Sequence, residues 1–337
     1  EMLRENFPMM KKWVEYIRHA GTIEYLWTDR WQYGDWLAMD GEGNKRCTGA
    51  TQVDLGASAY YANSVQCVIN AGKILGEDVS AYEKLHDNII IAFNDNFMEN
   101  GMPCMSKHIS CRHEKNSEEQ QIVRAITQTT LVLILHFKLY QTEEVRKNLA
   151  AKLVEIIHEN GDRISTGFVG TPYILHVLTD NGYTDVAYKL LFQEKMPSWL
   201  YSVNHGATTM WERWNCVKDD GTFSDVSMTS FNHYAYGAVA DWLYGDVAGI
   251  VSLADGAGYS HISIAPKPSR KLGFVNCKVE TGHGAVVSKW YYGKEFVHYE
   301  FEIPEGTTAE LKLTDGTEKT LAAGKYMFTS KAPEYDK

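Results

Sequence analysis

The spacing of the apolar residues changes once along this chain, from a helical period to the two-residue period of β-strands. Through residues 1–247 the apolar positions recur at helical spacing; in the first such stretch Met10, Trp13 and Ile17 lie on one face. Through residues 248–337, short alternating runs are separated by Gly, Pro and Asp turns. We therefore expect a helical domain over 1–247, followed by an antiparallel β-sandwich domain over 248–337.

The helical segments form pairs of similar length. Eight such segments are expected, at 2–21, 49–76, 79–98, 118–140, 143–161, 171–182, 183–195 and 230–249. The segment 118–140 is apolar nearly all round, which predicts a buried inner helix, and 143–161 is its amphipathic partner. An alternation of buried and amphipathic helices predicts an α/α toroid, in which inner and outer helices alternate.

Two long connectors between these helices are rich in aromatic residues and glycine, residues 22–44 and residues 197–225. Together they carry six tryptophans: Trp27, Trp31, Trp36, Trp199, Trp211 and Trp214. Disordered linkers lack such residues, and long loops in compact domains are usually functional, so we expect them to line a cleft. Nine Trp and twenty Tyr in an acidic chain favour a carbohydrate site, because aromatic faces stack on the C–H faces of sugars.

The overall composition argues against several other classes of protein. The formal net charge is −10, which disfavours a nucleic-acid binder, and no apolar run approaches the roughly 18 residues of a membrane span. Six scattered cysteines in 337 residues do not resemble a disulfide scaffold, and Cys67, in a helical pattern, is expected to be buried. Phosphate-binding glycine motifs and G-x-S-x-G are absent from the sequence, so neither a nucleotide cofactor nor an α/β-hydrolase is expected.

The sequence leaves the compartment of the protein open between cytoplasm and periplasm. Residues 1–10 contain neither an initiator methionine nor a basic-then-apolar targeting segment. We expect the chain to be a fragment of a longer protein.

Glu212 is the strongest candidate for a catalytic group. It stands in the stretch GATTMWERWN, between Trp211 and Trp214 and next to Arg213. The indole rings could exclude water, and the guanidinium could keep the carboxylate ionised, as a general base requires. The alternative is a Glu–Arg pair that caps a helix beside core tryptophans.

A second group of acids follows the glycine of the first connector. Asp35 precedes Trp36 in WQYGDWLAMDGEG, with Asp40 and Glu42 further on. A glycine before an acid in an aromatic loop allows the backbone to approach a ligand closely. Gly-Asp is also common turn chemistry, and on composition alone a plain turn is favoured.

His233 is expected at the start of the last helical segment, behind Ser230 and Asn232, both of which can cap a helix. A single histidine near a helix start is more often a structural hydrogen-bonding group than a catalytic one.

The run CMSKHISCRH raises the question of a metal. It holds Cys104, His108, Cys111 and His113 within ten residues. Zinc sites usually have two separated pairs of ligands, and this spacing is too short for an easy tetrahedron. The neighbouring basic residues would also repel a cation, so a solvated loop is favoured and no cofactor is expected.

Several stretches together resemble one family, the bacterial α-L-rhamnosidases with an (α/α)₆ catalytic barrel. They occur in the family's order: GDWLAMDG, TQTTLVLILHFKLY, STGFVGTPYILHVLTDNGYTDVAYKLL, PSWLYSVNHGATTMWERWN and SFNHYAYGAVADWLYGDVAGI. YSHISIAPKP resembles the start of the family's C-terminal β-sandwich. The similarity covers nearly the whole chain, and the spacing between GATTMWERW and the histidine of NHYAYG is its most specific feature.

The resemblance implies a role for each candidate. Glu212 is similar to the general base of an inverting mechanism, His233 to a sugar-contacting histidine, and Trp36 to a tryptophan that walls the rhamnose pocket. Asp35, Trp199 and Trp211 would be neighbours of the bound sugar. The implied partner is a rhamnosylated glycan or glycoside.

One departure from the family concerns the general acid. In the family it lies upstream, in a segment resembling D-x-R-x-E-R-x-G-W-x-G-D, and nothing in this chain resembles that segment. We therefore expect residues 1–247 to be the C-terminal portion of a catalytic barrel, and this chain alone to show little or no rhamnosidase activity.

Two other functions remain open. One is another α/α-toroid hydrolase, for a uronic or deoxy sugar, which should place Arg or Lys in its pocket wall if the sugar is a uronate. The other is a catalytically inactive sugar-binding fragment.

Overall fold

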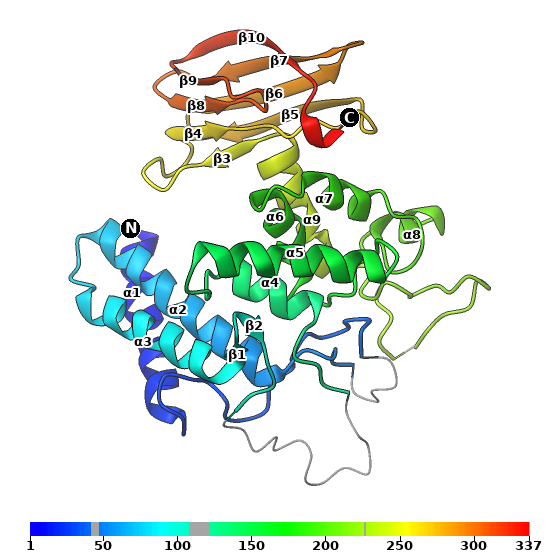
Figure 1. The fold of residues 1–337 in the computed structure, drawn as a ribbon. Helices are drawn as coiled ribbons and strands as arrows, with labels where there is room; N and C mark the ends of the chain where they lie inside the picture. Colours follow the sequence, from blue (N-terminus) through cyan, green and yellow to red (C-terminus); the bar gives the residue numbers. More distant parts are fainter. Residues whose placement is uncertain (42–46, 108–121, 226, 337) are drawn as a thin grey trace.

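The computed structural model describes residues 1–337 except 42–46, 108–121, 226 and 337. A helical layer lies below two stacked β-sheets (Figure 1). The helices are α1 (Met2–Ala20), α2 (Val53–Leu75), α3 (Ser80–Phe97), α4 (Gln128–His136), α5 (Glu143–Glu159), α6 (Thr171–Asp180), α7 (Thr184–Leu191), α8 (Trp199–Asn204), the 3₁₀ turn η1 (Ala235–Ala238), α9 (Val239–Trp242) and the π turn η2 (Leu243–Val247).

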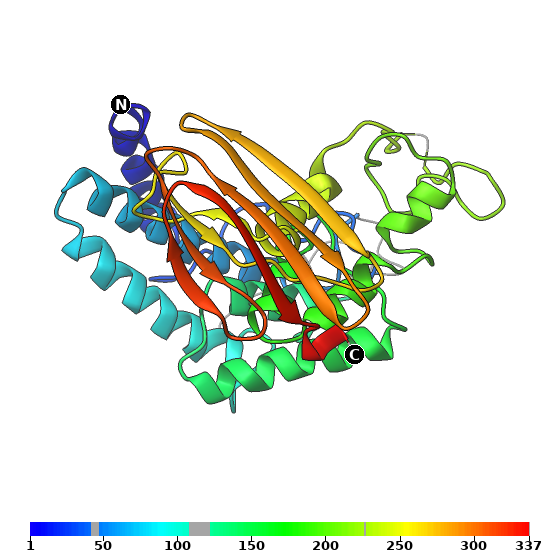
Figure 2. The ribbon, with the colours of Figure 1, turned by 90° about the horizontal axis from the view of Figure 1, so that it is seen from above.

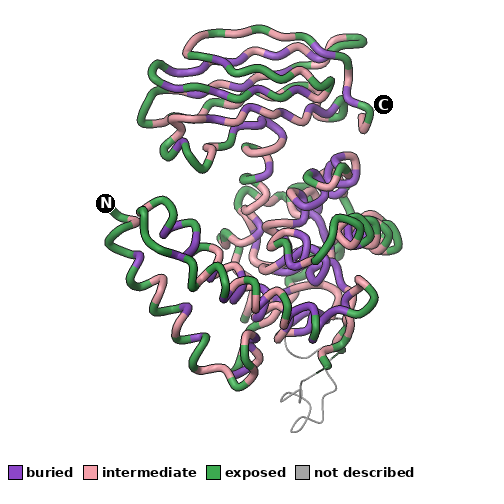
Figure 3. Tube along the Cα trace, turned by 60° about the vertical axis from the view of Figure 1, so that its left-hand side comes forward, coloured by how far each residue is buried: buried purple, intermediate pink, exposed green. Residues whose placement is uncertain are grey.

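Inner and outer helices alternate as the periodicity predicts. Helices α2, α4, α6 and α9 pack against one another in series, and α1, α3, α5 and α7 each pack on the outside of an inner helix. All residues of α4 from Gln128 to Leu135 are buried, whereas α5 buries only one stripe, which includes Leu149 and Leu153. Figure 3 shows the buried positions gathered in the middle of the helical layer. The predicted α/α-toroid arrangement is therefore confirmed.

The β-domain consists of two four-stranded sheets, which Figure 2 shows lying across the helices. Their strands are β3 (Ile250–Ser252), β4 (His261–Ile264), β5 (Phe274–Thr281), β6 (Gly284–Tyr292), β7 (Phe296–Ile303), β8 (Thr308–Lys312), β9 (Glu318–Leu321) and β10 (Gly324–Lys331). The strand orders are β10-β7-β6-β5 and β3-β4-β8-β9. Two further short strands, β1 (Met98–Glu99) and β2 (Met102–Pro103), form a hairpin in the helical layer, and a 3₁₀ turn, η3 (Glu334–Asp336), follows β10.

The sandwich buries one face of each sheet. Alternate residues of β7 are buried, and Trp290 and Tyr299 are 0% and 1% exposed between the sheets. One pairing, between β4 and β8, is parallel. The chain leaves β4, builds three strands of the other sheet and re-enters beside β4 in the same direction, which is the crossover that a parallel pair requires.

The two domains are joined through the end of the helical layer. The indole N–H of Trp290 donates to the Val247 carbonyl at 2.8 Å, and the Ser288 hydroxyl donates to the Ala248 carbonyl at 2.6 Å. The last helical turn ends at Val247 and the first strand begins at Ile250. We keep 1–247 and 248–337 as the proposed domains.

Three expectations about the helices need correction. Within the segment 118–140, residues 122–127 are not helical and the helix begins only at Gln128, because the Arg124 amide donates to the Ala50 carbonyl at 2.7 Å. Cys67 lies on α2 as expected but on its exposed face. The connector 197–225 contains the short helix α8, which the periodicity did not indicate. Within the described residues, no helix has both the length and the apolar character needed to cross a membrane.

Candidate active site

Glu212 and His233, far apart in the chain, lie in two neighbouring segments. The Glu212 amide donates to the Ser230 carbonyl at 2.9 Å, and the His233 amide donates to the Met210 carbonyl at 2.9 Å. In addition, the Thr209 hydroxyl donates to the Phe231 carbonyl. The segments around residues 210 and 232 are thus held side by side, and the structure brings together the two residues predicted to bind sugar and activate water.

The Glu212 side chain is fixed at one of its oxygens. The Ser230 amide donates to Oε2 at 2.9 Å, and no described residue donates a hydrogen bond to Oε1. Arg213, predicted to hold this carboxylate ionised, instead approaches Asp225, with 4.0 Å between Nη1 and Oδ2. The Glu–Arg pair that would cap a helix is absent from the described residues, and Glu212 lies outside every described helix.

His233 precedes the helical turn η1 instead of beginning it. Its Nδ1 accepts a hydrogen bond from the Ala235 amide at 3.3 Å, so the histidine itself caps the turn. The Ser230 hydroxyl accepts from the Asn232 amide at 3.2 Å and therefore fixes the loop before it. The imidazole ring stacks on Phe168, with 5.0 Å between the ring centroids.

The tryptophans of the second connector lie beneath this loop rather than on its surface. Trp214 stacks on Tyr236 at 3.9 Å between centroids and meets Trp199 edge-on at 5.3 Å. The Trp199 indole N–H donates to the Tyr236 carbonyl at 2.9 Å. Trp211, 5% exposed, packs edge-on against Phe231. These side chains hold the Glu212 loop in place, and all three tryptophans are too deeply buried to present a ring face to a sugar.

Asp35 is buried, with 2% of its surface exposed. Its carboxylate accepts hydrogen bonds from the Thr129 hydroxyl at 2.5 Å and from the amides of Gly167 and Val169 at 2.8 Å each. Burial raises the pKa of Asp35 to about 6, although these hydrogen bonds oppose the shift. The side chain thus joins the first connector to α4 and to the turn before α6.

The other acids of the first connector differ from Asp35. The Asp40 carboxylate accepts from the Ala50 amide at 2.8 Å, and burial raises its pKa. This bond closes the connector on itself. Glu42 lies outside the described residues.

Phe168 links Trp36 to His233, and sequence reasoning did not assign it a role. Its amide donates to the Trp36 carbonyl at 2.9 Å, while its ring stacks on His233 and meets Tyr236 edge-on at 5.4 Å. Trp36 is half-buried. A signal was present in the sequence: two glycines enclose an aromatic residue in TGFVGTP, which indicates a tight turn that carries a large side chain.

Gly167 allows the backbone of this turn to touch the first connector. A Cβ atom at this position would lie 2.1 Å from the Trp36 carbonyl oxygen and 2.6 Å from the Ala38 nitrogen. Since both neighbours are backbone atoms, a side chain cannot be accommodated here without moving one of the two segments.

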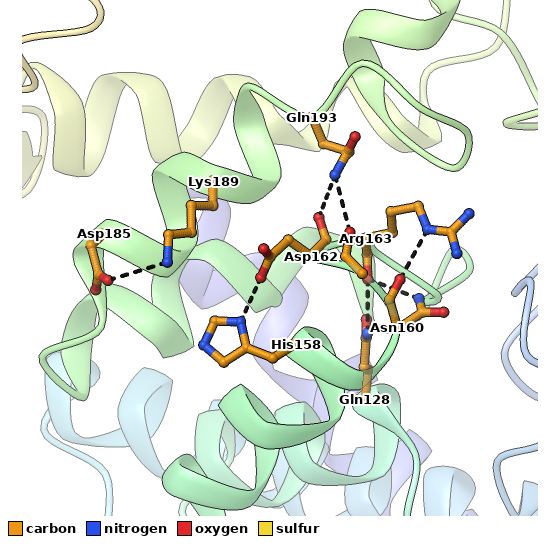
Figure 4. Close-up of polar contacts among 9 residues, drawn as sticks. Gln128, His158, Asn160, Asp162, Arg163, Asp185, Lys189 and Gln193 are labelled. Carbon is orange, nitrogen blue, oxygen red and sulfur yellow. Dashed lines mark hydrogen bonds and ion pairs between the residues drawn. The ribbon is translucent and has the colours of Figure 1, made fainter.

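The chain before this turn is fixed by the first residue of α4. Figure 4 shows the Gln128 side-chain amide donating to the Arg163 carbonyl, at 3.0 Å, beside Asn160, which donates to the same oxygen. The Gln128 side-chain oxygen also accepts from the Ser165 amide at 2.8 Å. The buried inner helix therefore positions the turn that carries Phe168.

A pocket of about 290 Å³ lies beside the first connector, lined by residues that include Tyr33, Asp35, Tyr60 and Thr129. Of the predicted site residues only Asp35 lines it, and its described lining includes no Arg or Lys. A larger cavity of about 710 Å³ lies between α7 and the β-domain and is lined by none of the predicted site residues.

The described residues contain no group of three His, Cys, Asp or Glu side chains placed to hold a metal ion. Three of the four residues in the Cys/His run, His108, Cys111 and His113, lie outside the described part of the chain.

Comparison with known proteins identifies both parts of the chain. Residues 1–247 match the model of the bacterial alpha-L-rhamnosidase 6 hairpin glycosidase domain, and residues 249–328 match that of the bacterial alpha-L-rhamnosidase C-terminal domain. An alpha-L-rhamnosidase of Formosa agariphila is 36% identical over 98% of this chain and 33% of its own length. One from Streptomyces avermitilis is 34% identical over 92% of this chain and 27% of its own length.

Two solved structures have the same architecture. The Streptomyces avermitilis alpha-L-rhamnosidase complexed with L-rhamnose matches with a TM-score of 0.83 and 31% identity, over 98% of this chain and 31% of that one. The Aspergillus terreus enzyme matches with a TM-score of 0.87 and 30% identity, over 99% of this chain and 37% of that one. More than nine-tenths of this chain matches each of three curated relatives. The matched part is a third or less of the length of each relative.

Proposed function

The chain belongs to the bacterial α-L-rhamnosidase family, and we propose that it forms the part of an inverting α-L-rhamnosidase that holds the sugar and activates the attacking water. Glu212 is the general base, and the sugar lies against Trp36 and His233. The observation that carries this proposal is the Glu212 carboxylate, whose Oε2 is bound by the Ser230 amide while Oε1 has no donor among the described residues.

The geometry of Glu212 suits the abstraction of a proton from water. A general base must be held in one orientation and must keep a lone pair within reach of the water. The bond from Ser230 holds the carboxylate, and Oε1 then takes the water proton as the oxygen attacks the anomeric carbon. Attack on the face opposite the leaving group inverts the configuration at that carbon.

We propose that the general acid is supplied by residues outside this chain. In inverting enzymes the two carboxyl groups stand roughly 6.5–9.5 Å apart across the scissile bond, and the acid must reach the glycosidic oxygen. Asp35 is unsuited to that task, because it is 2% exposed and both of its oxygens already accept hydrogen bonds. We assign Asp35 a structural role beside the sugar site.

The remaining predicted residues support the site indirectly. Trp199 and Trp211 position the Glu212 loop through Tyr236 and Phe231. Arg213, paired with Asp225, steadies the same loop.

The test combines binding with turnover. Titration calorimetry should detect binding of L-rhamnose to the chain, with weaker binding of L-mannose, whose additional hydroxyl replaces a hydrogen of the rhamnose methyl group. An aryl α-L-rhamnoside is then assayed with the chain and with the longest protein that its gene encodes. Proton NMR identifies the first anomer released, which should be β-L-rhamnose.

Glu212→Gln should lower kcat of the active form by about 10²–10⁴-fold without changing rhamnose binding. Asp219→Asn, in the same connector and with a 90% exposed side chain, is the matched control. Absence of rhamnose binding would overturn the proposal. Binding without turnover in every form would identify an inactive sugar-binding protein, and rapid turnover by the chain alone would show that the acid lies within it.

A further inference from the structure

Two aromatic side chains of the first connector stand in solvent. Trp31 is 56% exposed and Tyr33 is 62% exposed. Their rings meet edge to face, with 4.1 Å between centroids, and the Tyr33 ring in turn meets the Trp36 ring edge-on at 5.7 Å. The three rings therefore form a continuous row that begins at the proposed rhamnose wall and ends in solvent.

The backbone beneath this row is held in an unusual conformation. Arg30 and Leu37, on either side of the row, have φ values of 66° and 60°. A bulky residue adopts such angles only where its surroundings enforce them. Here the Leu37 amide donates to the Cys47 carbonyl at 2.6 Å, and the neighbouring Asp35 carboxylate is bound by three donors. The exposed rings are therefore carried on a fixed segment.

The row is also continuous with a cavity. Tyr33 lines the 290 Å³ pocket together with Asp35 and Tyr60, while Trp31 lies beyond that lining. The nearest cation in the sequence, Arg30, has its guanidinium over the Tyr16 ring at 5.3 Å, on the α1 side. The exposed part of the row thus consists of two neutral aromatic rings, Trp31 and Tyr33, next to the proposed sugar site.

We propose that Trp31 and Tyr33 form an acceptor subsite, which binds the group to which rhamnose is linked. Rings of this kind bind a flat apolar face, either the C–H face of a neighbouring sugar or a planar phenolic ring. This inference rests on the proposed function, because the row has this meaning only if rhamnose lies against Trp36. In this proposal Trp31 and Tyr33 determine which rhamnosides bind and take no part in bond cleavage.

The experiment compares three ligands that share rhamnose and differ in the acceptor: methyl α-L-rhamnoside, a rhamnosyl disaccharide and a phenyl α-L-rhamnoside. Calorimetric titration of the chain should show that the disaccharide or the phenyl glycoside binds about 5- to 10-fold more tightly than the methyl glycoside. Trp31→Ala and Tyr33→Ala should each abolish this difference. Trp31→Ala, whose ring contacts Tyr33 and not the rhamnose wall, should also leave the Kd for the methyl glycoside unchanged.

Trp13→Ala is the matched control, because Trp13 is 54% exposed and its ring also contacts a tyrosine ring, but on α1. It should leave all three dissociation constants unchanged, and thermal melting should show that all variants remain folded. If only the disaccharide loses affinity, the acceptor is a sugar; if only the phenyl glycoside does, it is a phenol.

The two proposals fail in different ways. If the methyl glycoside does not bind at all, the proposed function itself is wrong. If it binds, but Trp31→Ala and Tyr33→Ala leave the relative affinities of the three ligands as they were, the acceptor subsite is wrong and the proposed function stands.

Discussion

Glu212 and Ser230 bind each other through two hydrogen bonds of 2.9 Å. The Glu212 amide donates to the Ser230 carbonyl, and the Ser230 amide donates to Glu212 Oε2. The first bond aligns the two segments and the second orients the carboxylate. Both use backbone groups of Ser230, so its hydroxyl is not required for either.

We expect Ser230→Pro to reduce turnover much more than Ser230→Ala, which removes only the bond from the Asn232 amide to the hydroxyl. Proline lacks the N–H that binds Oε2, and the loss of a hydrogen bond to a charged group costs about 1.5–3 kcal/mol, or roughly 10- to 150-fold in kcat. Steady-state kinetics on an aryl rhamnoside, with the active form of the protein, measures this. Equal losses in the two variants would mean that the hydroxyl, and not the amide, supports Glu212.

Asp35→Asn should destabilise the fold, and most strongly at low pH. An amide NH₂ in place of one oxygen would face a backbone N–H or the Thr129 hydroxyl, at a cost of about 1–3 kcal/mol. Because the folded-state pKa of Asp35 is raised to about 6, its contribution to stability is fully present below about pH 4 and is lost as the pH rises to about 6. Between about pH 4 and pH 6, the free energy of unfolding of the wild type falls by up to about 3 kcal/mol through this group, and that of Asp35→Asn does not.

Urea unfolding at a series of pH values measures this difference. Asp78→Asn is the control, because the hydrogen bond from the Ser80 amide lowers the pKa of Asp78. The contribution of Asp78 to stability therefore changes with pH in the opposite direction. It is present above the unfolded-state pKa and is lost as the pH falls. A difference between wild type and Asp35→Asn that does not change with pH would contradict the raised pKa.

Gly167→Ala should disrupt the contact between the turn and the first connector. The new methyl group would lie 2.1 Å from the Trp36 carbonyl oxygen, so one backbone segment must move, at a cost of about 2 kcal/mol or more. Gly237→Ala, also near the site, is the control. Its Cβ would lie 3.9 Å from the nearest atom, in Met210, and should leave stability unchanged or slightly higher. Melting temperatures compare the two, and similar values for both would contradict the close approach.

Phe168→Leu should weaken rhamnose binding, because it removes the ring that supports His233. The ring of Phe168 stacks on His233, and such pairs contribute about 0.5–1.5 kcal/mol, so we expect a roughly 2- to 10-fold higher Kd. Phe223→Leu replaces a 55% exposed ring in the same region and should leave Kd unchanged. Calorimetry with L-rhamnose measures both; a normal Kd in Phe168→Leu would show that His233 needs no support from this ring.

Local patterns in the sequence predicted which segments are helices and which are strands. The predictions that were wrong depend on contacts between distant parts of the chain. Helical periodicity over 118–140 did not reveal that residues 122–127 are not helical, because the bond from Arg124 to Ala50 joins distant parts of the chain. The same periodicity could not show that Cys67 is exposed, since a helix reveals its covered face only when its neighbours are known. The family resemblance was available from the sequence because its motifs are contiguous.

The sequence by itself determined the order of helices and strands, the family, and Glu212 and His233 as candidates, because these follow from local spacing and contiguous motifs. Only the tertiary structure decided which carboxylate can reach a ligand. Asp35 and Glu212 both stand beside tryptophans in aromatic loops, yet Asp35 is closed off by Thr129 and Gly167, 94 and 132 positions away. Glu212 keeps one oxygen without a donor among the described residues. Burial depends on residues that are distant in the chain, so the local pattern around Asp35 could not show that this acid is enclosed.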